Sequence, residues 1–451
     1  MQRGFDIAVI GGGVVGLAIL RRFAMSGLSC VLLERGADIL SGASKGNSGL
    51  LHTGFDAPAG SLELACIRAG YAEYIDIRGR LNLPLVKSSA LVVAWSEEER
   101  TKLAGIVAKA HANGVEDVRP VESDELRRLE PRLSPAAKAA VLVPGEHIID
   151  PWSAPLAYAH QALAHGAVIL RDAEVTGGEF AQGAWRLASK AGPVSARAVI
   201  NAAGNFGDLV EAIARPPPFT ITPRRGQFVV FDKPASQLVT AIILPVPSDR
   251  TKGVVLFRTA YGNLAIGPTA EDVPEREVAA TDTATLERLK ARALEMAPSL
   301  SGIGVSAIYA GLRPATEHKD YVIEALPGRS WITVGGIRST GLTASLGIAR
   351  HVAGLYASHF GALPSQPDPI WTPVPNLTEE RPRPYMQGGE IACHCERVTR
   401  GEIERALEGP LPAGDLGGLR RRTRAMMGRC QGFSCSAHVE KLFREKTRGA
   451  A

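Results

Sequence analysis

Apolar and polar positions at the start of the chain fall into short blocks that predict a strand, a turn, a helix and a second strand. The run Phe5–Ile10 is apolar apart from Asp6 and predicts a buried strand. Three glycines follow, and residues 17–26 then have the apolar spacing of a helix that Gly27 ends. The block Cys30–Glu34, apolar up to its last residue, predicts the next strand.

Strand-like and helix-like blocks continue to alternate up to about residue 360. Residues 199–204 predict a buried strand ending in a turn of small residues, and residues 335–343 form a glycine-rich loop before a helix predicted over 344–356. Residues 361–385 then contain seven prolines, a composition typical of a stiff, extended linker. The small, basic and cysteine-bearing remainder, from about residue 386, predicts a separate module.

Composition and charge narrow the class of protein. A chain of 451 residues with 45% hydrophobic and 22% charged residues is globular, and roughly 150 residues per domain predicts about three domains. The net charge of +5 is concentrated at the end, because residues 381–451 hold fourteen basic and eight acidic side chains. Such a region suits an acidic partner or a bound anion. It lacks the interleaved aromatic residues of a nucleic-acid surface, so we expect no nucleic-acid partner.

The sequence predicts neither a membrane span nor a secretion signal. The apolar run Ile7–Leu20 has 14 residues, short of the roughly 20 that a span needs, and three glycines interrupt it. Arg21 and Arg22 follow where a signal peptidase requires small residues. We expect a cytoplasmic protein, peripheral at the inner face of the membrane only through a partner.

Gly11, Gly13 and Gly16 form the pattern G-x-G-x-x-G between the first strand and its helix. The first glycine allows a tight turn, the second lets the backbone approach a pyrophosphate, and the third lets the helix pack on the strand. The N-terminus of the helix then faces the phosphates. Glu34, at the end of the second strand, is placed to accept hydrogen bonds from a ribose diol. Its charge disfavours a 2′-phosphate, so FAD or NAD is expected in preference to NADP.

Three further stretches are small and polar enough to lie against a large cofactor: the loop SGASKGNSGLLHTG at residues 41–54, the turn after residue 201, and the loop at 335–343. The cofactor contacts expected beyond the glycine fingerprint and Glu34 are Arg35, Ser44, Asn47, Ser48, Gly49, Leu51, Ala203, Gly204, Gly336, Arg338, Ser339, Thr340, Gly341, Leu342 and Thr343.

Four of the six cysteines lie in the last 59 residues, as C-x-C (Cys393, Cys395) and, 34 residues later, C-x4-C (Cys430, Cys435). Without a secretion signal, such clustering indicates a metal site before disulfides. Four thiolates suit a [2Fe–2S] cluster or a structural zinc, and this spacing is unusual for zinc. The other two, Cys30 and Cys66, fall in a predicted strand and helix and are expected to be core residues.

These motifs resemble known families. The fingerprint, GNSGLLHTGF, VINAAGNFGD, YAGLRPAT and GGIRSTGLTASLGIA occur in this order in the glycine-oxidase/D-amino-acid-oxidase superfamily of FAD enzymes, a resemblance that covers roughly residues 5–360. Within it they look most like glycerol-3-phosphate dehydrogenases, especially the A subunit of the anaerobic type. The L-2-hydroxyglutarate oxidase branch shares the first loop. The C-x-C and C-x4-C spacing resembles the [2Fe–2S] domain of the bacterioferritin-associated ferredoxin type, and the stretch RRRTRAMMGRCQGFSC looks like the tail of the anaerobic glycerol-3-phosphate dehydrogenase A subunit.

The resemblance implies an α/β fold with three parts. A discontinuous Rossmann-like FAD-binding domain takes residues 1–85, 150–215 and 320–360. A substrate domain with an antiparallel sheet takes 86–149 and 216–319. The proline-rich linker at 361–385 leads to a [2Fe–2S] module at 386–451.

The resemblance also implies roles for individual side chains. His52 lies in the loop that the family places beside the flavin ring, where it acts as base, substrate ligand or flavin contact. Arg313 matches the substrate-facing arginine of the family, and its guanidinium suits a carboxylate or phosphate. Arg338 is a second candidate for an anion. Arg258 and Tyr261 are expected on the substrate side, although related sequences do not always have arginine there. Lys252 and His318 are expected to be peripheral.

The function implied is an FAD-dependent dehydrogenase of a small anionic hydroxy compound, most simply sn-glycerol 3-phosphate. Electrons are expected to leave through the [2Fe–2S] cluster to an acceptor protein, partner subunit or quinone-linked acceptor. The same flavin chemistry on L-2-hydroxyglutarate, another 2-hydroxy acid or an amino acid is the first alternative. A non-catalytic electron-transfer or zinc-binding adaptor is an alternative of another class.

Overall fold

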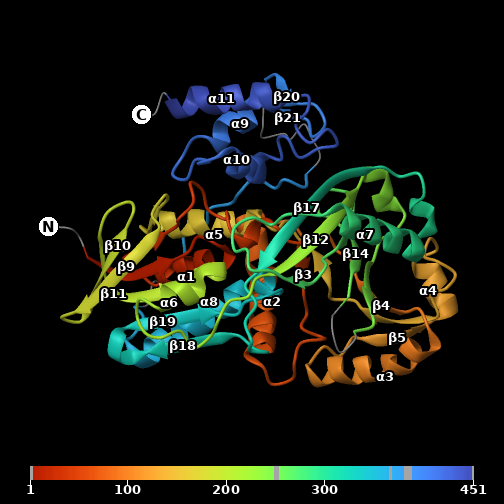
Figure 1. Cartoon of the computed structure of the whole chain (residues 1–451), viewed down its shortest axis with the longest axis horizontal. Coiled ribbons are helices and arrows are strands. Elements are labelled where there is room, and N and C mark those ends of the chain that lie inside the picture. The colour runs from red at the N-terminus through yellow and green to blue at the C-terminus, as the bar shows by residue number, and fades with distance from the viewer. Residues whose placement is uncertain (1–3, 248–252, 365–367, 380–388, 449–451) are drawn as a thin grey trace.

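The computed structural model describes residues 4–247, 253–364, 368–379 and 389–448 (Figure 1). Among the helices in these ranges, none combines the length and the apolar character that a membrane span needs. The helices are α1 (Val14–Met25), α2 (Leu62–Leu81), α3 (Glu97–Ala112), α4 (Ser123–Leu129), α5 (Ser153–Ala164), α6 (Gly207–Glu211), α7 (Thr283–Met296), α8 (Gly341–His359), α9 (Arg400–Ala406), α10 (Leu416–Thr423) and α11 (Ser436–Arg448).

One sheet, with eight strands in the described residues, lies at one end of the long axis, in the order β18-β19-β11-β1-β2-β8, with β10 and β9 added beside β11. Its strands are β1 (Phe5–Ile10), β2 (Cys30–Leu33), β8 (Val168–Leu170), β9 (Val175–Ala181), β10 (Ala184–Ser189), β11 (Val194–Asn201), β18 (Val322–Leu326) and β19 (Trp331–Gly335). The pairings from β19 through β11, β1 and β2 to β8 are parallel. The α/β class is therefore confirmed, and β1 has the bounds that the sequence predicts. Helix α1 begins three residues earlier than predicted.

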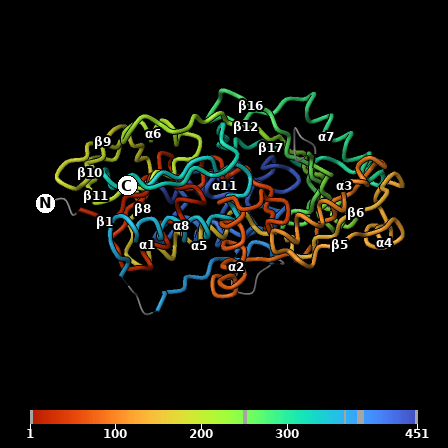
Figure 2. Tube along the Cα trace, turned by 90° about the horizontal axis from the view of Figure 1, so that it is seen from below, coloured from red at the N-terminus to blue at the C-terminus, as the bar shows by residue number. Residues whose placement is uncertain are grey.

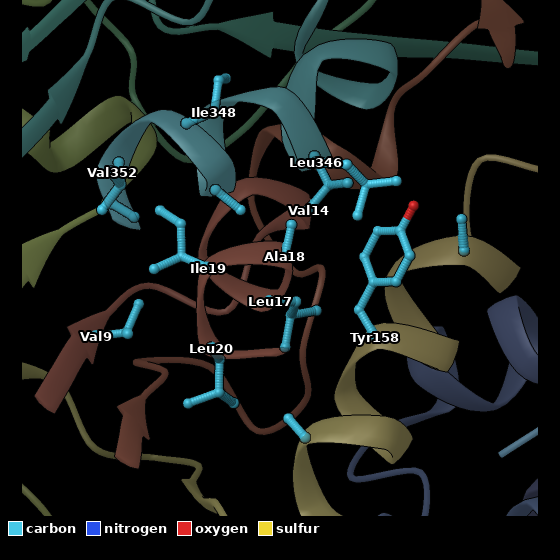
Figure 3. Packing of buried hydrophobic residues seen from close by; sticks show 14 of the residues in the cluster. Val9, Val14, Leu17, Ala18, Ile19, Leu20, Tyr158, Leu346, Ile348 and Val352 are labelled. Atoms are coloured by element: carbon cyan, nitrogen blue, oxygen red, sulfur yellow. The ribbon is translucent and has the colours of Figure 1, made fainter. Parts of the chain in front are cut away.

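The core of this part lies between the sheet and three helices. Leu17, Leu20 and Ile19 of α1 are fully buried and pack among side chains of α8 and α5, including Val352 and Tyr158 (Figure 3). Apolar side chains over most of the surface of α1 explain its position, because such a helix is stable only when most of its surface is covered. The first turn of α1 is thereby held at the carboxyl ends of β1 and β2.

A second sheet, with nine strands in the described residues, fills the other end of the molecule, as both views show (Figures 1 and 2). Its pairings are antiparallel except between β4 and β13. Its strands are β4 (Ala90–Ala94), β5 (Arg119–Glu122), β6 (Ala139–Val143), β12 (Arg224–Phe231), β13 (Ile242–Pro245), β14 (Val255–Arg258), β15 (Leu264–Gly267), β16 (Glu271–Asp272) and β17 (Val305–Arg313). A two-stranded ladder of β3 (Leu50–Leu51) and β7 (His147–Ile148) belongs to neither large sheet.

The C-terminal module has its own small core and lies on one side of the body, above α5 in the view of Figure 1. It contains the two-stranded ladder β20 (Ile391–Cys393) and β21 (Val398–Thr399) and the helices α9, α10 and α11. Ile403, Leu419 and Val439, one from each helix, are fully buried together. The described part of the proline-rich segment, 368–379, runs along the body, where Val374 is buried and donates its N–H to the Leu81 carbonyl at 3.1 Å.

A buried ion pair fixes the module to the body. Asp38, in the loop after β2, is fully buried, and both of its oxygens accept from the Arg422 guanidinium, with an Nη2–Oδ1 distance of 2.9 Å. The N–H of Gly414 also donates to Asp38, at 3.2 Å. The approach is so close that a Cβ atom at Gly418 would lie 1.6 Å from Asp38 Oδ2. The start of α10 therefore sits directly on this carboxylate.

We expect Asp38→Asn to loosen the module, because a buried guanidinium is left without its counter-charge, a change that costs about 3–5 kcal/mol in buried pairs. Hydrogen–deuterium exchange of α10 in the full-length holoprotein should accelerate. The matched control is Asp76→Asn, which breaks the exposed pair with Arg80 and should cost less than about 1 kcal/mol. Equal exchange of α10 in the two variants would contradict this account of the docking.

Candidate functional site

The glycine turn between β1 and α1 is built by close backbone approach. Gly11 has φ +109°, in the region that favours glycine. A Cβ atom at Gly16 would lie 2.0 Å from the Gly11 carbonyl oxygen, so only glycine lets α1 pack this near to the strand. Gly13, at the N-cap, brings no capping side chain, while the N–H of Val14 donates to Ser44 Oγ at 3.0 Å. The turn, the helix N-terminus and the nearby hydroxyl fit a pyrophosphate.

Glu34 lies where the sequence predicts it, directly after β2. Its two oxygens accept from the N–H groups of Gly12, at 2.7 Å, and Gly36, at 2.8 Å. Burial raises the pKa of this carboxyl above its ordinary value, against the effect of the two N–H donors. Arg35, by contrast, stacks over the Phe206 ring at 4.0 Å and pairs with Glu277 at 2.7 Å, so its side chain is held against the loop that follows β11.

The two predicted cofactor loops at residues 41–54 and 335–343 meet in the structure. Thr343 Oγ1 accepts from the N–H of His52 at 3.0 Å and donates to the Leu50 carbonyl at 3.3 Å. Asn47 closes its own turn by accepting from the N–H of Gly49 at 2.8 Å. All the predicted cofactor contacts stay predictions, those described above as well as Ser48, Leu51, Ala203, Gly204, Gly336, Arg338, Ser339, Thr340, Gly341 and Leu342.

His52 is paired with a carboxylate that the sequence analysis does not single out. Its Nδ1 lies 2.9 Å from Oε2 of Glu146, whose side chain is 1% exposed. The other carboxylate oxygen accepts from the N–H of Thr53 at 2.6 Å and from its hydroxyl at 2.9 Å. This arrangement places the proton of the neutral imidazole on Nδ1 and leaves Nε2 as an acceptor. The two residues are 94 positions apart, and the pairing of β3 with β7 joins the segments that carry them.

Arg313 and Arg338 are both held by backbone carbonyls. Arg313, the last residue of β17, donates to the carbonyls of Thr269 at 2.6 Å, Arg224 at 3.3 Å and Arg225 at 3.4 Å. Burial, together with the nearby Arg224 guanidinium, lowers its pKa to about 10. Arg338 donates to the Lys319 carbonyl. These contacts fix the two guanidinium groups in place, and their roles toward an anion remain predictions.

Arg258 and Tyr261 lie against the C-terminal module. They line a cavity of about 400 Å³ together with Lys233 and, from the module, Cys395 and Glu396. The Tyr261 ring is stacked between Trp152 and Arg424. The structure therefore brings these two predicted substrate residues together with the cysteine region.

Two further residues, His318 and Lys252, are predicted to be peripheral. His318 is at the surface, with its Nε2 3.1 Å from the Pro218 carbonyl. Lys252 lies outside the described residues.

The four C-terminal cysteines come together as two pairs. The thiols of Cys395 and Cys430 contact each other, as do those of Cys393 and Cys435. Hydrogen bonding from the Ser434 N–H holds the pKa of Cys430 at about 7, while burial raises that of Cys435 to about 12. Within the described ranges, no three or more ligand side chains converge on one metal position. A [2Fe–2S] cluster needs two ligands on each iron, and the two pairs of cysteine thiols supply such a donor set.

The arginines ahead of Cys430 mostly bind the body of the protein. Arg422 pairs with Asp38, Arg421 donates to the Ile39 carbonyl at 3.0 Å, and Arg429 lies 3.1 Å from Asp232. Arg424 is 3.3 Å from Glu396 and stacks on Tyr261. The sequence suggests that these charges offset a bound anion or face an acidic partner. The structure shows that most of them dock the module.

A parallel sheet with a glycine turn, a second sheet beside it and a paired four-cysteine module define a flavoprotein with a built-in iron–sulfur domain. The chain belongs to the FAD dependent oxidoreductase (DAO) family, whose profile matches residues 6–355, and the BFD-like [2Fe-2S] binding domain matches residues 391–445. It is thus an FAD-dependent oxidoreductase whose cofactors are FAD and a [2Fe–2S] cluster.

Similar proteins span nearly the whole chain. A glycerol 3-phosphate dehydrogenase of Caloramator mitchellensis is 30% identical over 98% of this chain and 94% of its own length. The A subunit of the anaerobic glycerol-3-phosphate dehydrogenase of Escherichia coli K12 is 27% identical over 97% of this chain and 87% of its own. The solved structure of L-α-glycerophosphate oxidase from Mycoplasma pneumoniae with FAD bound has a TM-score of 0.76 and 27% identity, and covers 82% of this chain and 98% of its own.

We expect Cys430→Ser to lose most of the two irons per chain of a [2Fe–2S] cluster and to keep FAD, because the cofactor fold is elsewhere. Iron, zinc and flavin analysis of anaerobically purified protein measures this. Cys66→Ala is the control, since this buried thiol belongs to the core around α2 and α8 and should leave the iron content unchanged. Full iron retention in Cys430→Ser would remove this residue from the ligand set.

Proposed function

We propose that this enzyme oxidises sn-glycerol 3-phosphate to dihydroxyacetone phosphate and passes the electrons through the [2Fe–2S] cluster to a partner protein. The observation that carries the proposal is the Caloramator relative, which is a glycerol 3-phosphate dehydrogenase and matches 98% of the chain, cysteine module included. The solved oxidase from Mycoplasma pneumoniae supports the same substrate for the body of the fold. The other substrates considered from the sequence remain outcomes of the test below.

In this proposal His52 is the base. FAD supplies a hydride acceptor when it is bound. The Nε2 of His52 takes the proton of the substrate hydroxyl, and the buried Glu146 carboxylate at Nδ1 stabilises the imidazolium that forms. Thr53 holds Glu146 from the other side through two hydrogen bonds, so the carboxylate cannot rotate away without losing both. The ring is therefore fixed in one tautomer before substrate arrives.

Arginine side chains provide the recognition of an anion. Arg313 rests on three backbone carbonyls, which hold its guanidinium without neutralising its charge, so the charge is available to a phosphate. Its half-buried position at the end of β17 strengthens such an interaction, because a surrounding of lower dielectric screens it less than water does. Arg338 in the loop before α8 is the second candidate for this role.

A partner is expected to take the electrons. The E. coli relative is the A subunit of its enzyme, which suits a protein that works with further subunits. An iron–sulfur cluster accepts single electrons, so it offers the reduced flavin an outlet other than oxygen. We propose that the enzyme works in the cytoplasm and that any membrane contact is made by the partner.

The direct test adds sn-glycerol 3-phosphate to anaerobic, fully loaded enzyme. We expect the flavin absorption to bleach and the electron paramagnetic resonance signal of a reduced [2Fe–2S] cluster to appear. If L-2-hydroxyglutarate or an amino acid bleaches the flavin and glycerol 3-phosphate does not, the proposed substrate is wrong, but the protein is still an FAD-dependent dehydrogenase. An enzyme that no compound in such a panel reduces would favour the adaptor hypothesis.

Glu146→Gln should slow flavin reduction by about 10²–10⁴-fold through the wrong tautomer of His52. The two donors of Thr53 require the amide oxygen on their side, which turns the amide NH₂ toward Nδ1 and leaves the N–H on Nε2. Stopped-flow absorbance of the flavin measures the rate. Tyr71→Phe is the control, because it removes only a hydrogen bond to the neighbouring Gly145 carbonyl and should change the rate little. Equal rates in the two variants would exclude His52 as the base.

A further inference from the structure

Side chains of the body and the module form a continuous chain of contacts between the predicted flavin loop and the cysteine region. Trp152 donates its indole N–H to the Lys45 carbonyl of the flavin loop at 3.4 Å and stacks on Tyr261, with ring centroids 5.9 Å apart and planes 17° apart. The Arg424 guanidinium also lies over the Tyr261 ring, 3.6 Å from its centroid. Arg424 Nε is 3.3 Å from Glu396, the residue next to Cys395.

Two buried carboxylates hold this stack in one geometry. Asp150, fully buried, accepts from the Tyr261 hydroxyl at 2.5 Å and from the N–H of Trp152 at 2.9 Å. On the module side, Glu396 and Arg424 each have side chains only 5% exposed. A charge buried to this extent is stable only with partners around it, so Arg424 cannot leave Tyr261 and Glu396 cheaply. The stack is therefore rigid from the flavin loop to the cysteine region.

In the stack, one packed contact follows another from the flavin loop to the residue next to Cys395. The 400 Å³ cavity beside it is lined by Tyr261 and Cys395, so the space between body and module opens next to the stack. Electron transfer between two cofactors slows steeply as the gap widens, and it is faster through packed atoms than through open space. The Tyr261 ring lies in the middle of this series of contacts, and Arg424 connects the ring to Glu396, beside Cys395.

We propose that Trp152, Tyr261 and Arg424 are positioning residues that hold the cluster at its working distance from the flavin and set the rate of electron transfer between them. This rests on the proposed function in one respect, the internal route from FAD to the cluster. Hydride transfer from substrate delivers two electrons. The two electrons reach the cluster one at a time. Each electron reduces the cluster by one electron, and an external one-electron acceptor then reoxidises the cluster before the next electron arrives. The protons that the reduced flavin loses go to solvent.

The experiment starts from flavin reduced by light in the full-length holoenzyme, with EDTA as the electron donor that is oxidised, so that the identity of the substrate does not matter. Cluster reduction is followed by rapid-freeze electron paramagnetic resonance, and flavin reoxidation by absorbance. We expect transfer to slow about tenfold or more in Tyr261→Leu, at an unchanged iron content and an unchanged cluster potential. Tyr261→Phe keeps the ring and should stay much nearer to the wild-type rate.

Arg424→Lys is the second variant. It keeps the positive charge beside Glu396 but loses the planar group over the ring, so slower transfer is expected. Its matched control is Arg80→Lys, which changes a similar stack on Trp371, at 4.3 Å, away from the route, and should leave the rate unchanged.

The outcomes separate the two proposals. Transfer in Tyr261→Leu within twofold of wild type, with the module still docked by hydrogen exchange of α10, would overturn the positioning role alone. If Tyr261→Leu undocks the module, Arg424→Lys decides: a slower rate than in Arg80→Lys supports the role, and an equal rate overturns it. No transfer in the wild type would remove the internal route, and this inference with it.

Discussion

The contact between Asp38 and the start of α10 is the constraint on which the arrangement of the two cofactor regions depends. Asp38 follows β2 by a few residues, so it is placed by the same strand that positions Glu34 at the predicted ribose site. Its buried carboxylate accepts hydrogen bonds from the Arg422 guanidinium. Gly418 has no side chain, so α10 can approach the carboxylate closely enough for this ion pair to form. A buried ion pair of this kind adds little net stability but strongly penalises any geometry that separates its partners. The module is thereby held in register with the flavin-binding turn.

This docking explains the unusual charge distribution of the chain. The basic C-terminal region suggests an external acidic partner when only its composition is considered, yet Arg421, Arg422, Arg424 and Arg429 are engaged by the body. The body is close to neutral over its whole length, but it presents carboxylates and carbonyls at the docking surface. Local geometry, and not net charge, therefore decides what these arginines bind. These four arginines are therefore not available to the proposed electron-accepting partner.

The proposed catalytic region is organised by one short ladder, the pairing of β3 with β7. The pairing of β3 with β7 places His52 against Glu146 and, a few residues further on, Asp150 against Tyr261. One side of this ladder thus serves proton transfer in the proposed reaction, while the other side leads toward the cysteine module. Burial of both carboxylates fixes their partners, because a buried carboxylate without donors is costly. Proton and electron leave the proposed reaction centre through different parts of the same small structure.

The sequence by itself determined the local features of this protein: the strand β1, the glycine turn that needs Gly11 and Gly16, the carboxylate Glu34, and the four cysteines as a group. These depend on neighbours in the chain, so periodicity, spacing and motif resemblance reveal them. The tertiary structure alone decided three contacts: the pairing of His52 with Glu146, the ion pair of Arg422 with Asp38, and the stacking of Arg424 on the Tyr261 ring. Those contacts join residues 94, 384 and 163 positions apart, and the side chains involved are common types without a motif. Their energy comes from burial and from the match of charges across elements, which only the folded chain creates.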